Sequence, residues 1–240
     1  MATKEQRKQQ VRAERRRKEA EAVRAARART LRLRLLGAVG AAVAVLAVVF
    51  AISATGSRPT SPATKADRAG QFAFAVGNPG PGASAPAIRL PSTTGETYDL
   101  AKRRGTTVLL YFQEGLGCQP CWDQIKDVEK RPELLRSLGI DEMVSITTND
   151  LENLRQKARD EGIRTQVLAD PDLAVSEAYA ANQYGMMGTS ADGHSFIVVG
   201  PDGEIRHRAD YGGAPNYTMY VPVENLVADM RAGLRGSAGA

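Results

Sequence analysis

Beyond residue 86, apolar residues occur in two alternating patterns. Short, nearly continuous apolar runs are typical of strands buried on both faces of a sheet. Between them, apolar residues recur every three or four positions, which is typical of helices with one buried face. The predicted strands are 106–113, 143–147, 165–168, 195–199 and 204–208, and the predicted helices are 119–138, 149–161, 170–181 and 221–234. This order predicts one α/β domain over residues 87–235, with a mixed sheet and helices on both faces.

The longest apolar stretch lies nearer the N-terminus. Residues 35–55 carry no charged side chain, and about 20 such residues span a hydrocarbon core of about 30 Å as one helix. Residues 1–34 carry 13 basic and 4 acidic side chains, and a positive flank of this kind stays on the cytoplasmic side. We therefore predict a single-pass protein of the cell membrane, with a transmembrane helix over 35–55, a cytoplasmic N-terminus and an extracytoplasmic domain. The alternative is a cleaved signal peptide, since Ala51-Ile52-Ser53 offers small residues, although the basic region is unusually long for one.

The remaining segments are predicted from composition. Residues 56–86 are rich in Gly, Pro, Ser and Ala and cannot bury enough apolar surface to fold, so we predict a flexible linker. The tail, 236–240, is predicted to be disordered. The formal net charge is +5, but the basic arm alone carries about +9, so the rest of the chain is mildly acidic. A folded surface of that charge does not favour nucleic-acid binding.

The two cysteines of the chain stand in the motif Cys118-Gln119-Pro120-Cys121, between the first predicted strand and the first predicted helix. At a helix N-terminus, unpaired N–H groups and the helix dipole stabilise a thiolate and lower its pKa. Pro120 fits the first helical turn, where no hydrogen bond is lost. We therefore predict an exposed attacking thiol at Cys118 and a buried resolving thiol at Cys121, which form a redox-active disulfide without a cofactor. The alternative is a structural disulfide, which would stabilise little over so short a loop.

Three stretches of the domain carry a family resemblance: APAIRLPSTTGETYDL, TTVLLYFQEGLGCQPCW and HSFIVVGPDGEIR. They resemble the redoxin, or AhpC/TSA-like, branch of the thioredoxin superfamily, which includes peroxiredoxins and membrane-tethered thioredoxin-like proteins. The resemblance implies a thioredoxin-like fold with its nucleophile at Cys118. It also implies an antioxidant thiol oxidoreductase that acts on protein thiols and disulfides or on a peroxide, and that draws on an electron donor the motif does not identify.

The motif departs from the patterns of these families. Peroxiredoxins carry Pro-X-X-X-Thr/Ser-X-X-Cys, whereas counting back from Cys118 gives Gly115 and Tyr111 in the Thr and Pro positions. The hydroxyl that would position a peroxide is therefore missing, which weakens the peroxide-reduction hypothesis against thiol–disulfide exchange. Thioredoxins carry Trp before the first cysteine, and here that residue is Gly117. Glu114, just before the turn, could carry protons to the pair or simply be solvated.

The position of the thioredoxin cis-proline, which faces the cysteine motif, falls on or near His194. A histidine there could serve the sulfur pair as acid, base or charge partner, or it could only form a hydrogen bond at the start of a strand. Sco-type copper chaperones offer a second hypothesis, because Cys118, Cys121 and His194 would present two thiolates and one imidazole to Cu(I). That family spaces its cysteines by three residues rather than two, so the redox hypothesis is favoured. His207 is predicted to be a surface residue.

Overall fold

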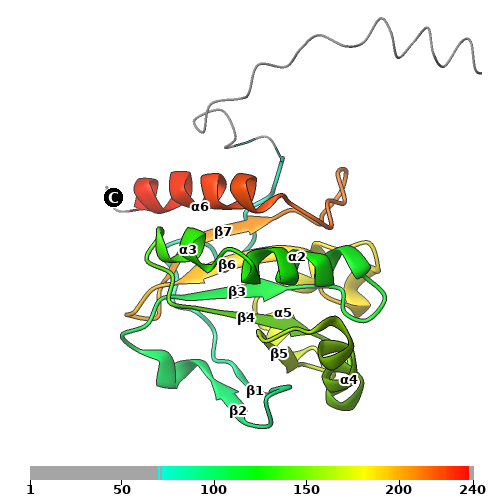
Figure 1. Cartoon of the computed structure of the whole chain (residues 1–240). Helices are drawn as coiled ribbons and strands as arrows, with labels where there is room; N and C mark the ends of the chain where they lie inside the picture. Colours follow the sequence, from blue (N-terminus) through cyan, green and yellow to red (C-terminus); the bar gives the residue numbers. More distant parts are fainter. Residues whose placement is uncertain (1–69, 71, 238–240) are drawn as a thin grey trace, which may run out of the picture. The chain divides into compact units, whose positions relative to one another are not determined.

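The computed structural model describes residues 70 and 72–237, and its centre is a five-stranded mixed sheet with the strand order β5-β4-β3-β6-β7 (Figure 1). The strands are β3 (Val108–Phe112), β4 (Glu142–Thr147), β5 (Gln166–Ala169), β6 (Ser195–Val199) and β7 (Ile205–Asp210). β3 is parallel to β4 and β4 to β5, while β6 is antiparallel to β3 and β7 to β6. Every residue of β3 is buried, as expected for a central strand between two covered faces. The predicted mixed sheet is confirmed.

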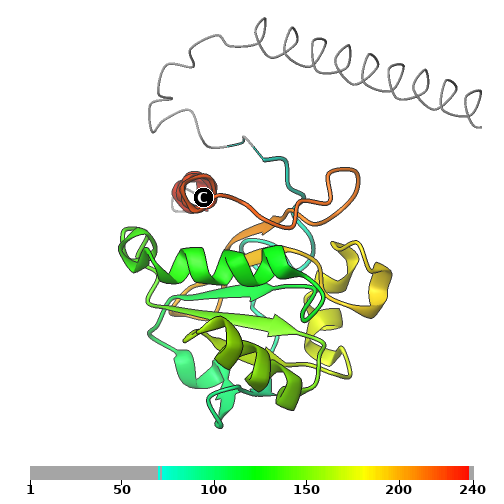
Figure 2. The ribbon, with the colours of Figure 1, turned by 45° about the vertical axis from the view of Figure 1, so that its right-hand side comes forward.

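Long helices cover one face of the sheet, and a short hairpin with short helical segments covers the other (Figures 1 and 2). The helices are α2 (Gln119–Glu129), α3 (Pro132–Arg136), α4 (Leu151–Glu161), α5 (Ala174–Ala178) and α6 (Val223–Ser237). The smaller elements are the hairpin strands β1 (Arg89–Pro91) and β2 (Thr97–Asp99) and the 3-10 turns η2 (Leu100–Arg103), η3 (Ala181–Gln183) and η4 (Gly188–Ser190). One core packs α2, α3, α4 and α6 on the first face, and a second core packs the hairpin, η2 and α5 on the other. Helices lie on both faces, but those on the second face are short.

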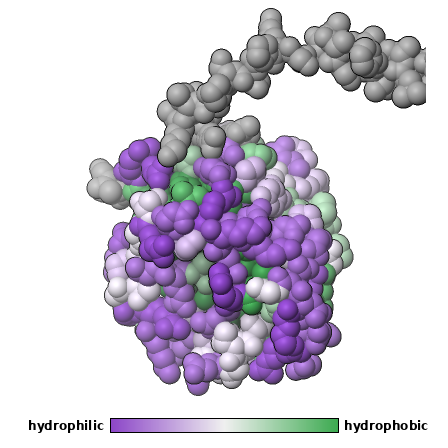
Figure 3. Space-filling model, in the orientation of Figure 1, coloured by the Kyte–Doolittle hydropathy of each residue, from purple (hydrophilic) through white to green (hydrophobic). Residues whose placement is uncertain are grey.

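α2 is amphipathic, as its apolar spacing indicates. Its buried side chains include Cys121, Trp122, Ile125 and Val128, which recur at helical spacing and join the core of the first face. The surface seen from the side of Figure 1 is mostly hydrophilic (Figure 3). The apolar face of α2 is therefore packed into the core of the first face. Its N-terminus, with the cysteine motif, follows the end of β3.

Two helices are shorter in the structure than their apolar spacing predicts. The segment 119–138 divides into α2 and α3 because Pro132 disfavours helical dihedrals at the preceding residue, and Arg131 adopts φ −133°. The segment 170–181 contracts to α5, since Leu173 adopts a left-handed conformation with φ 63°. In both cases the local backbone conformation overrides the apolar periodicity.

Residues 72–86, which composition assigns to a flexible linker, pack against the domain, and we name them the strap. They run beside the free edge of β7, where Ala75 exchanges two backbone hydrogen bonds with Asp210, at 3.0 and 2.9 Å. Further along, Gly82 donates to the carbonyl oxygen of Ile205 at 2.9 Å. An edge strand offers a row of unpaired N–H and C=O groups, and bonds to this row order the strap although it has little apolar surface of its own. The flexible-linker prediction therefore does not hold for 72–86.

A buried ion pair on β7 also binds the strap. Arg208 and Asp210 are both fully buried, and their Nε and Oδ2 atoms lie 2.8 Å apart. The strap adds two hydrogen bonds, because Gly77 N donates to Asp210 Oδ2 at 2.7 Å and Arg208 Nη1 donates to the Pro79 carbonyl at 3.0 Å. A buried ion pair needs such additional partners to offset its desolvation. The strap and the domain therefore stabilise each other.

In the described part of the chain, no helix has the length and apolar character that a membrane crossing requires. The predicted arm (1–34), the predicted span (35–55) and residues 56–69 of the predicted linker lie outside the described residues. At the other end, α6 continues to Ser237. The first part of the predicted disordered tail, 236–240, is therefore helical.

Candidate redox site

The cysteine motif lies where β3 ends and α2 begins. Cys118 precedes the first helical residue, and its carbonyl oxygen accepts hydrogen bonds from the N–H groups of Cys121 at 3.0 Å and Trp122 at 3.4 Å. The two cysteines form a disulfide with their Cα atoms 5.3 Å apart. Cys118 is 6% exposed and Cys121 is fully buried. The structure thus brings the two sulfurs together at the positive end of the helix, with Cys118 the more accessible residue although it is more buried than the sequence led us to expect.

The turn between β3 and α2 is held around Gly115. Its N–H donates to Gln113 Oε1 at 2.7 Å, and its carbonyl oxygen accepts the indole N–H of Trp122 at 3.0 Å. Gly115 adopts φ +87°, and a Cβ atom there would collide with the side chains of Asn149 and Thr147. The position where the peroxiredoxin pattern has Thr or Ser therefore admits only glycine in this fold.

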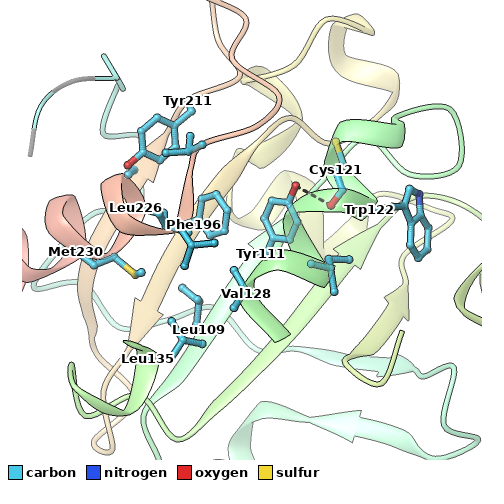
Figure 4. Packing of buried hydrophobic residues seen from close by; sticks show 14 of the residues in the cluster. Leu109, Tyr111, Cys121, Trp122, Val128, Leu135, Phe196, Tyr211, Leu226 and Met230 are labelled. Carbon is cyan, nitrogen blue, oxygen red and sulfur yellow. Dashed lines mark hydrogen bonds between the residues drawn. The ribbon is translucent and has the colours of Figure 1, made fainter. Parts of the chain in front are cut away.

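His194 is linked to the motif through Tyr111. The Tyr111 hydroxyl lies 2.8 Å from His194 Nδ1 and 3.5 Å from the carbonyl oxygen of Cys121. Both rings are fully buried, and Figure 4 shows Tyr111 pointing from β3 toward Cys121. Tyr111 pairs with Phe196, two residues after His194, so all three side chains share one face of the sheet. The pairing register of β3 and β6 is what identifies Tyr111 as a residue of the site. The sequence pattern shows it only as the residue that stands where peroxiredoxins have a proline.

Burial sets the protonation of both rings. It lowers the pKa of His194 to about 3, because the imidazolium would lose its hydration in the core. Burial also raises the pKa of Tyr111 well above its ordinary value, and the negative charge of Glu114 adds to this effect. At neutral pH the site therefore contains a neutral imidazole and a neutral phenol. An uncharged histidine of this kind is not a charge partner for a thiolate.

Glu114 links the loop that contains Tyr184 and Met186 to the turn before the cysteine motif. Its carboxylate accepts a hydrogen bond from the backbone N–H of Met186. In the same loop, the Tyr184 carbonyl oxygen accepts a hydrogen bond from the backbone N–H of His194 at 3.0 Å. The loop therefore bridges the turn before the motif and the strand start that carries the histidine.

Comparison with known proteins identifies the family. The sequence model of the AhpC/TSA family matches residues 81–208, a segment that is more than half of the chain and contains the cysteine motif and His194. The chain belongs to the AhpC/TSA family. It is a peroxiredoxin-like thiol oxidoreductase of the thioredoxin superfamily.

Relatives of this AhpC/TSA-family chain carry peroxiredoxin names. "Putative peroxiredoxin Rv2521" of Mycobacterium tuberculosis strain H37Rv is 32% identical over 130 residues, which cover 52% of this chain and 81% of the relative. Among solved structures, Peroxidoxin BcpB from Mycobacterium tuberculosis aligns with a TM-score of 0.52 and 16% identity, over 63% of this chain and 96% of that chain. The reduced 2-Cys peroxiredoxin of Plasmodium vivax aligns with a TM-score of 0.54 and 16% identity, over 65% and 83%. The solved structures support the thioredoxin-like fold.

The copper hypothesis has no geometric support in this AhpC/TSA-family domain. Across residues 70 and 72–237, no group of three or more His, Cys, Asp or Glu side chains is close enough to hold a metal ion. Cys118 and Cys121 are bonded to each other, and Nδ1 of His194 faces the Tyr111 hydroxyl.

His207 is buried, which corrects its prediction as a surface residue. It is 4% exposed, and burial lowers its pKa to about 4. Its ring meets Phe74 of the strap edge-on, with centroids 6.2 Å apart, and lies against Gly233 of α6. These contacts make His207 a packing residue between the strap and α6.

Proposed function

We propose that this domain catalyses thiol–disulfide exchange through Cys118 and Cys121. The Cys118 thiolate attacks one sulfur of a substrate disulfide, forms a mixed disulfide and releases the first substrate thiol. The Cys121 thiol, after losing its proton, attacks Cys118, forms the intramolecular disulfide and releases the second substrate thiol, so that two electrons pass to the substrate. The observation that carries the proposal is the placement of both sulfurs at the first turn of α2, within bonding reach. An external electron donor then reduces the pair.

Peroxide reduction is the second candidate, and membership of the AhpC/TSA family favours it. In that reaction the Cys118 thiolate takes one oxygen atom from a hydroperoxide, becomes a sulfenic acid and releases an alcohol or water. The Cys121 thiol then condenses with the sulfenic acid to give the same disulfide and water. Gly115 counts against this candidate, because its surroundings exclude a side-chain hydroxyl.

Stopped-flow fluorescence separates the two reactions, because Trp122 is the single tryptophan and follows Cys121 directly. The reduced full chain is mixed in turn with hydrogen peroxide and with insulin, a protein that contains disulfides. We expect a fast, saturable change with insulin and a reaction with peroxide no faster than that of a free thiol. A fast peroxide phase that Cys118→Ser removes would instead establish peroxide reduction.

Two variants provide the controls for exchange. Cys118→Ser should abolish the fast change, since it removes the nucleophile. Cys121→Ser should accumulate a mixed disulfide with insulin, visible as an added mass that a reductant removes. Turnover retained in Cys118→Ser would contradict both reactions.

We propose further that the chain is a single-pass protein of the cell membrane, with its redox domain outside the cytoplasm. The uncharged apolar segment 35–55 and the basic residues before it support this orientation. The partners of Cys118 would then be extracytoplasmic protein thiols and disulfides. Protease added to intact spheroplasts that express the chain should degrade the domain. Complete protection until the cells are lysed would place the domain in the cytoplasm.

A further inference from the structure

Three segments that are far apart in the sequence line a cavity of about 480 Å³, which we name the edge cavity. Its lining comes from residues 73–75 of the strap, 183–184 before β6 and 210–216 after β7. Ligand pockets of proteins have volumes of about 300–1,000 Å³, so this cavity is large enough to hold a ligand. Because the strap forms one wall, the cavity exists only while residues 73–75 stay on the domain.

The exposed large apolar side chains of the domain gather around the edge cavity. Among residues 70 and 72–237, they are Phe74, Val76, Met186, Met187 and Tyr217. Phe74 lines the cavity, and each of the others lies one to three positions beyond a segment that lines it. Apolar side chains scattered singly over a surface carry no particular meaning, whereas exposed apolar side chains in one place are typical of a site that binds another protein. The edge cavity therefore has the surroundings of a protein-binding site.

Aromatic rings form the apolar part of the lining. Phe74 packs edge-on against Tyr211, with ring centroids 5.2 Å apart, and the guanidinium of Arg208 lies 5.6 Å from the centre of the Tyr184 ring. Phe74 is exposed, Tyr184 is half-buried and Tyr211 is buried, so the lining runs from exposed rings to buried ones. Rings held in this way offer a large apolar area to an entering side chain.

The polar part of the lining carries no unpaired charge. Gln183 and Asn216 are exposed amides, and an amide both donates and accepts hydrogen bonds, as a peptide backbone does. Among the residues that line the cavity, Asp210 is the charged one, and its carboxylate is buried against the guanidinium of Arg208. This balance of charge complements an uncharged polypeptide segment, and it offers no free charge to an anion, a nucleic acid or a strongly charged peptide.

The edge cavity and the sulfur pair lie at the same end of the sheet. In the strand register, Phe112 at the end of β3 pairs with Ser195 at the start of β6, and Ser195 pairs with Asp210 at the end of β7. The turn before α2 (green), the segment before β6 (yellow) and the loop after β7 (orange) accordingly lie at one end of the sheet in Figures 1 and 2. The backbone N–H of Met186, beside the cavity, donates to Glu114 of that turn. A polypeptide held in the cavity is therefore held at the end of the sheet that carries the cysteine motif.

We propose that the edge cavity binds an extended, uncharged apolar segment of a substrate protein whose disulfide reacts at Cys118. The inference rests on the proposed exchange reaction and names its substrate class, which is proteins with accessible apolar segments, as in chains that have not finished folding. The aromatic rings take up apolar side chains of the segment, and the two amides bind its backbone. The bonds that form and break at the sulfurs are those of the exchange reaction. A small disulfide makes no use of the cavity and reacts at Cys118 alone.

Exchange kinetics with two oxidants separate binding in the cavity from chemistry at the sulfurs. The reduced full chain is mixed with scrambled ribonuclease, an unfolded protein with non-native disulfides, and with the small disulfide dithiobis(nitrobenzoate). Phe74→Ser combined with Met186→Ser should raise the half-saturating concentration of scrambled ribonuclease by about 10-fold, so that its rate constant falls equally relative to that of the small disulfide. The control is Leu134→Ser, which removes a half-buried apolar side chain from α3 at the other end of the sheet (Figure 1) and should retain the wild-type ratio.

Peptide binding is measured without chemistry at the sulfurs. The probe is a capped, cysteine-free peptide of leucine, threonine and glutamine, added to the full chain labelled at the methionine methyl groups. The methyl signals of Met186 and Met187 should shift in a saturable way, and Met186→Ser identifies the first of them. The signal of Met143, on β4, is the internal control and should not move. A peptide of lysine and glutamate should shift none of the three signals.

The outcomes distinguish the cavity from the chemistry. A wild-type ratio in the double variant, at an unchanged urea midpoint, would overturn the role of the cavity, and so would a peptide that leaves Met186 and Met187 unshifted. A wild-type chain that associates with itself in light scattering, and that the double variant makes monomeric, would assign this surface to a second copy instead. Absence of any reaction with dithiobis(nitrobenzoate) would refute the exchange reaction, and the cavity would then be judged on peptide binding alone.

Discussion

Two glycines in the turn before Cys118 contribute in different ways. Gly115 has a positive φ, and the side chains of Thr147 and Asn149 occupy the space that a Cβ atom would need. Around Gly117 an added Cβ would meet no atom within 4 Å. Only Gly115 is therefore required by conformation and by space. The missing peroxiredoxin hydroxyl is a consequence of how this turn packs against the end of β4, and one substitution cannot restore it.

Alanine at the two positions should have unequal effects. Gly115→Ala should lower the free energy of unfolding by at least about 2 kcal/mol, since it combines a left-handed backbone with a steric collision. Gly117→Ala should change it by less than about 0.5 kcal/mol. Urea unfolding of the full chain, followed by Trp122 fluorescence, measures both. Equal effects would mean that Gly115 is not confined as the structure indicates.

Among the elements, the carboxylate of Glu161 is one of the groups that link α4 to α2. Glu161, the last residue of α4, accepts hydrogen bonds from three side chains: Lys126 at 2.7 Å, Lys157 at 2.7 Å and Gln119 at 3.0 Å. These bonds, those from the two lysines above all, lower the pKa of Glu161 to about 2. Gln119 follows Cys118 in the sequence, so the link steadies the turn that carries the sulfur pair.

Glu161→Gln should destabilise the chain more near neutral pH than in acid. The pKa of about 2 in the folded state lies below the ordinary value of 4.5. The carboxylate therefore stabilises the fold above about pH 4.5, and this contribution is lost as the pH falls toward 2. The gap between the urea midpoints of wild type and variant should narrow from about pH 6 to about pH 3.

Glu152→Gln is the matched control for this pH dependence. It removes a carboxylate from the same helix, at a side chain that is 77% exposed. An exposed ion pair contributes little to stability, so the variant should resemble wild type at both pH values. If the gap caused by Glu161→Gln stays constant in acid, the link between α2 and α4 does not depend on charge.

For the whole molecule, the folded unit begins before residue 87. The strap pairs with the free edge of β7 and supplies two hydrogen bonds to the buried ion pair of Arg208 and Asp210. Phe74 of the strap also packs on Tyr211, with ring centroids 5.2 Å apart. The strap is therefore part of the redox domain, and the linker predicted over 56–86 does not extend over 72–86.

Deletion of residues 70–86 should destabilise the domain. Two hydrogen bonds to buried charged groups would be lost, at about 1–3 kcal/mol each, and the open edge of β7 would favour self-association. Urea unfolding and light scattering of the full chain with this deletion measure the two effects. Deletion of residues 56–69 serves as the control and should preserve wild-type stability. If the two deletions are equivalent, the strap is not a structural part of the domain.

The sequence by itself determined the features that depend on neighbouring residues. Apolar patterns located the five strands of the central sheet, although not the short hairpin strands β1 and β2. The spacing of Cys118 and Cys121 at a strand–helix junction located the redox pair. Both follow from local geometry, since a helix N-terminus and one helical turn involve only a few consecutive residues. The membrane span over 35–55 stays a prediction of the same local kind.

Only the tertiary structure decided which distant residues meet. Tyr111 and His194 are 83 positions apart, and they touch because β3 and β6 pair in one register. The space around Gly115 is likewise limited by the side chains of Thr147 and Asn149, at and just after the end of β4. The prediction from composition that residues 72–86 form a flexible linker was wrong. A segment poor in apolar side chains can still be ordered when its backbone forms hydrogen bonds with an exposed strand edge. Register, burial and edge pairing are properties of the packed chain, and a linear pattern does not contain them.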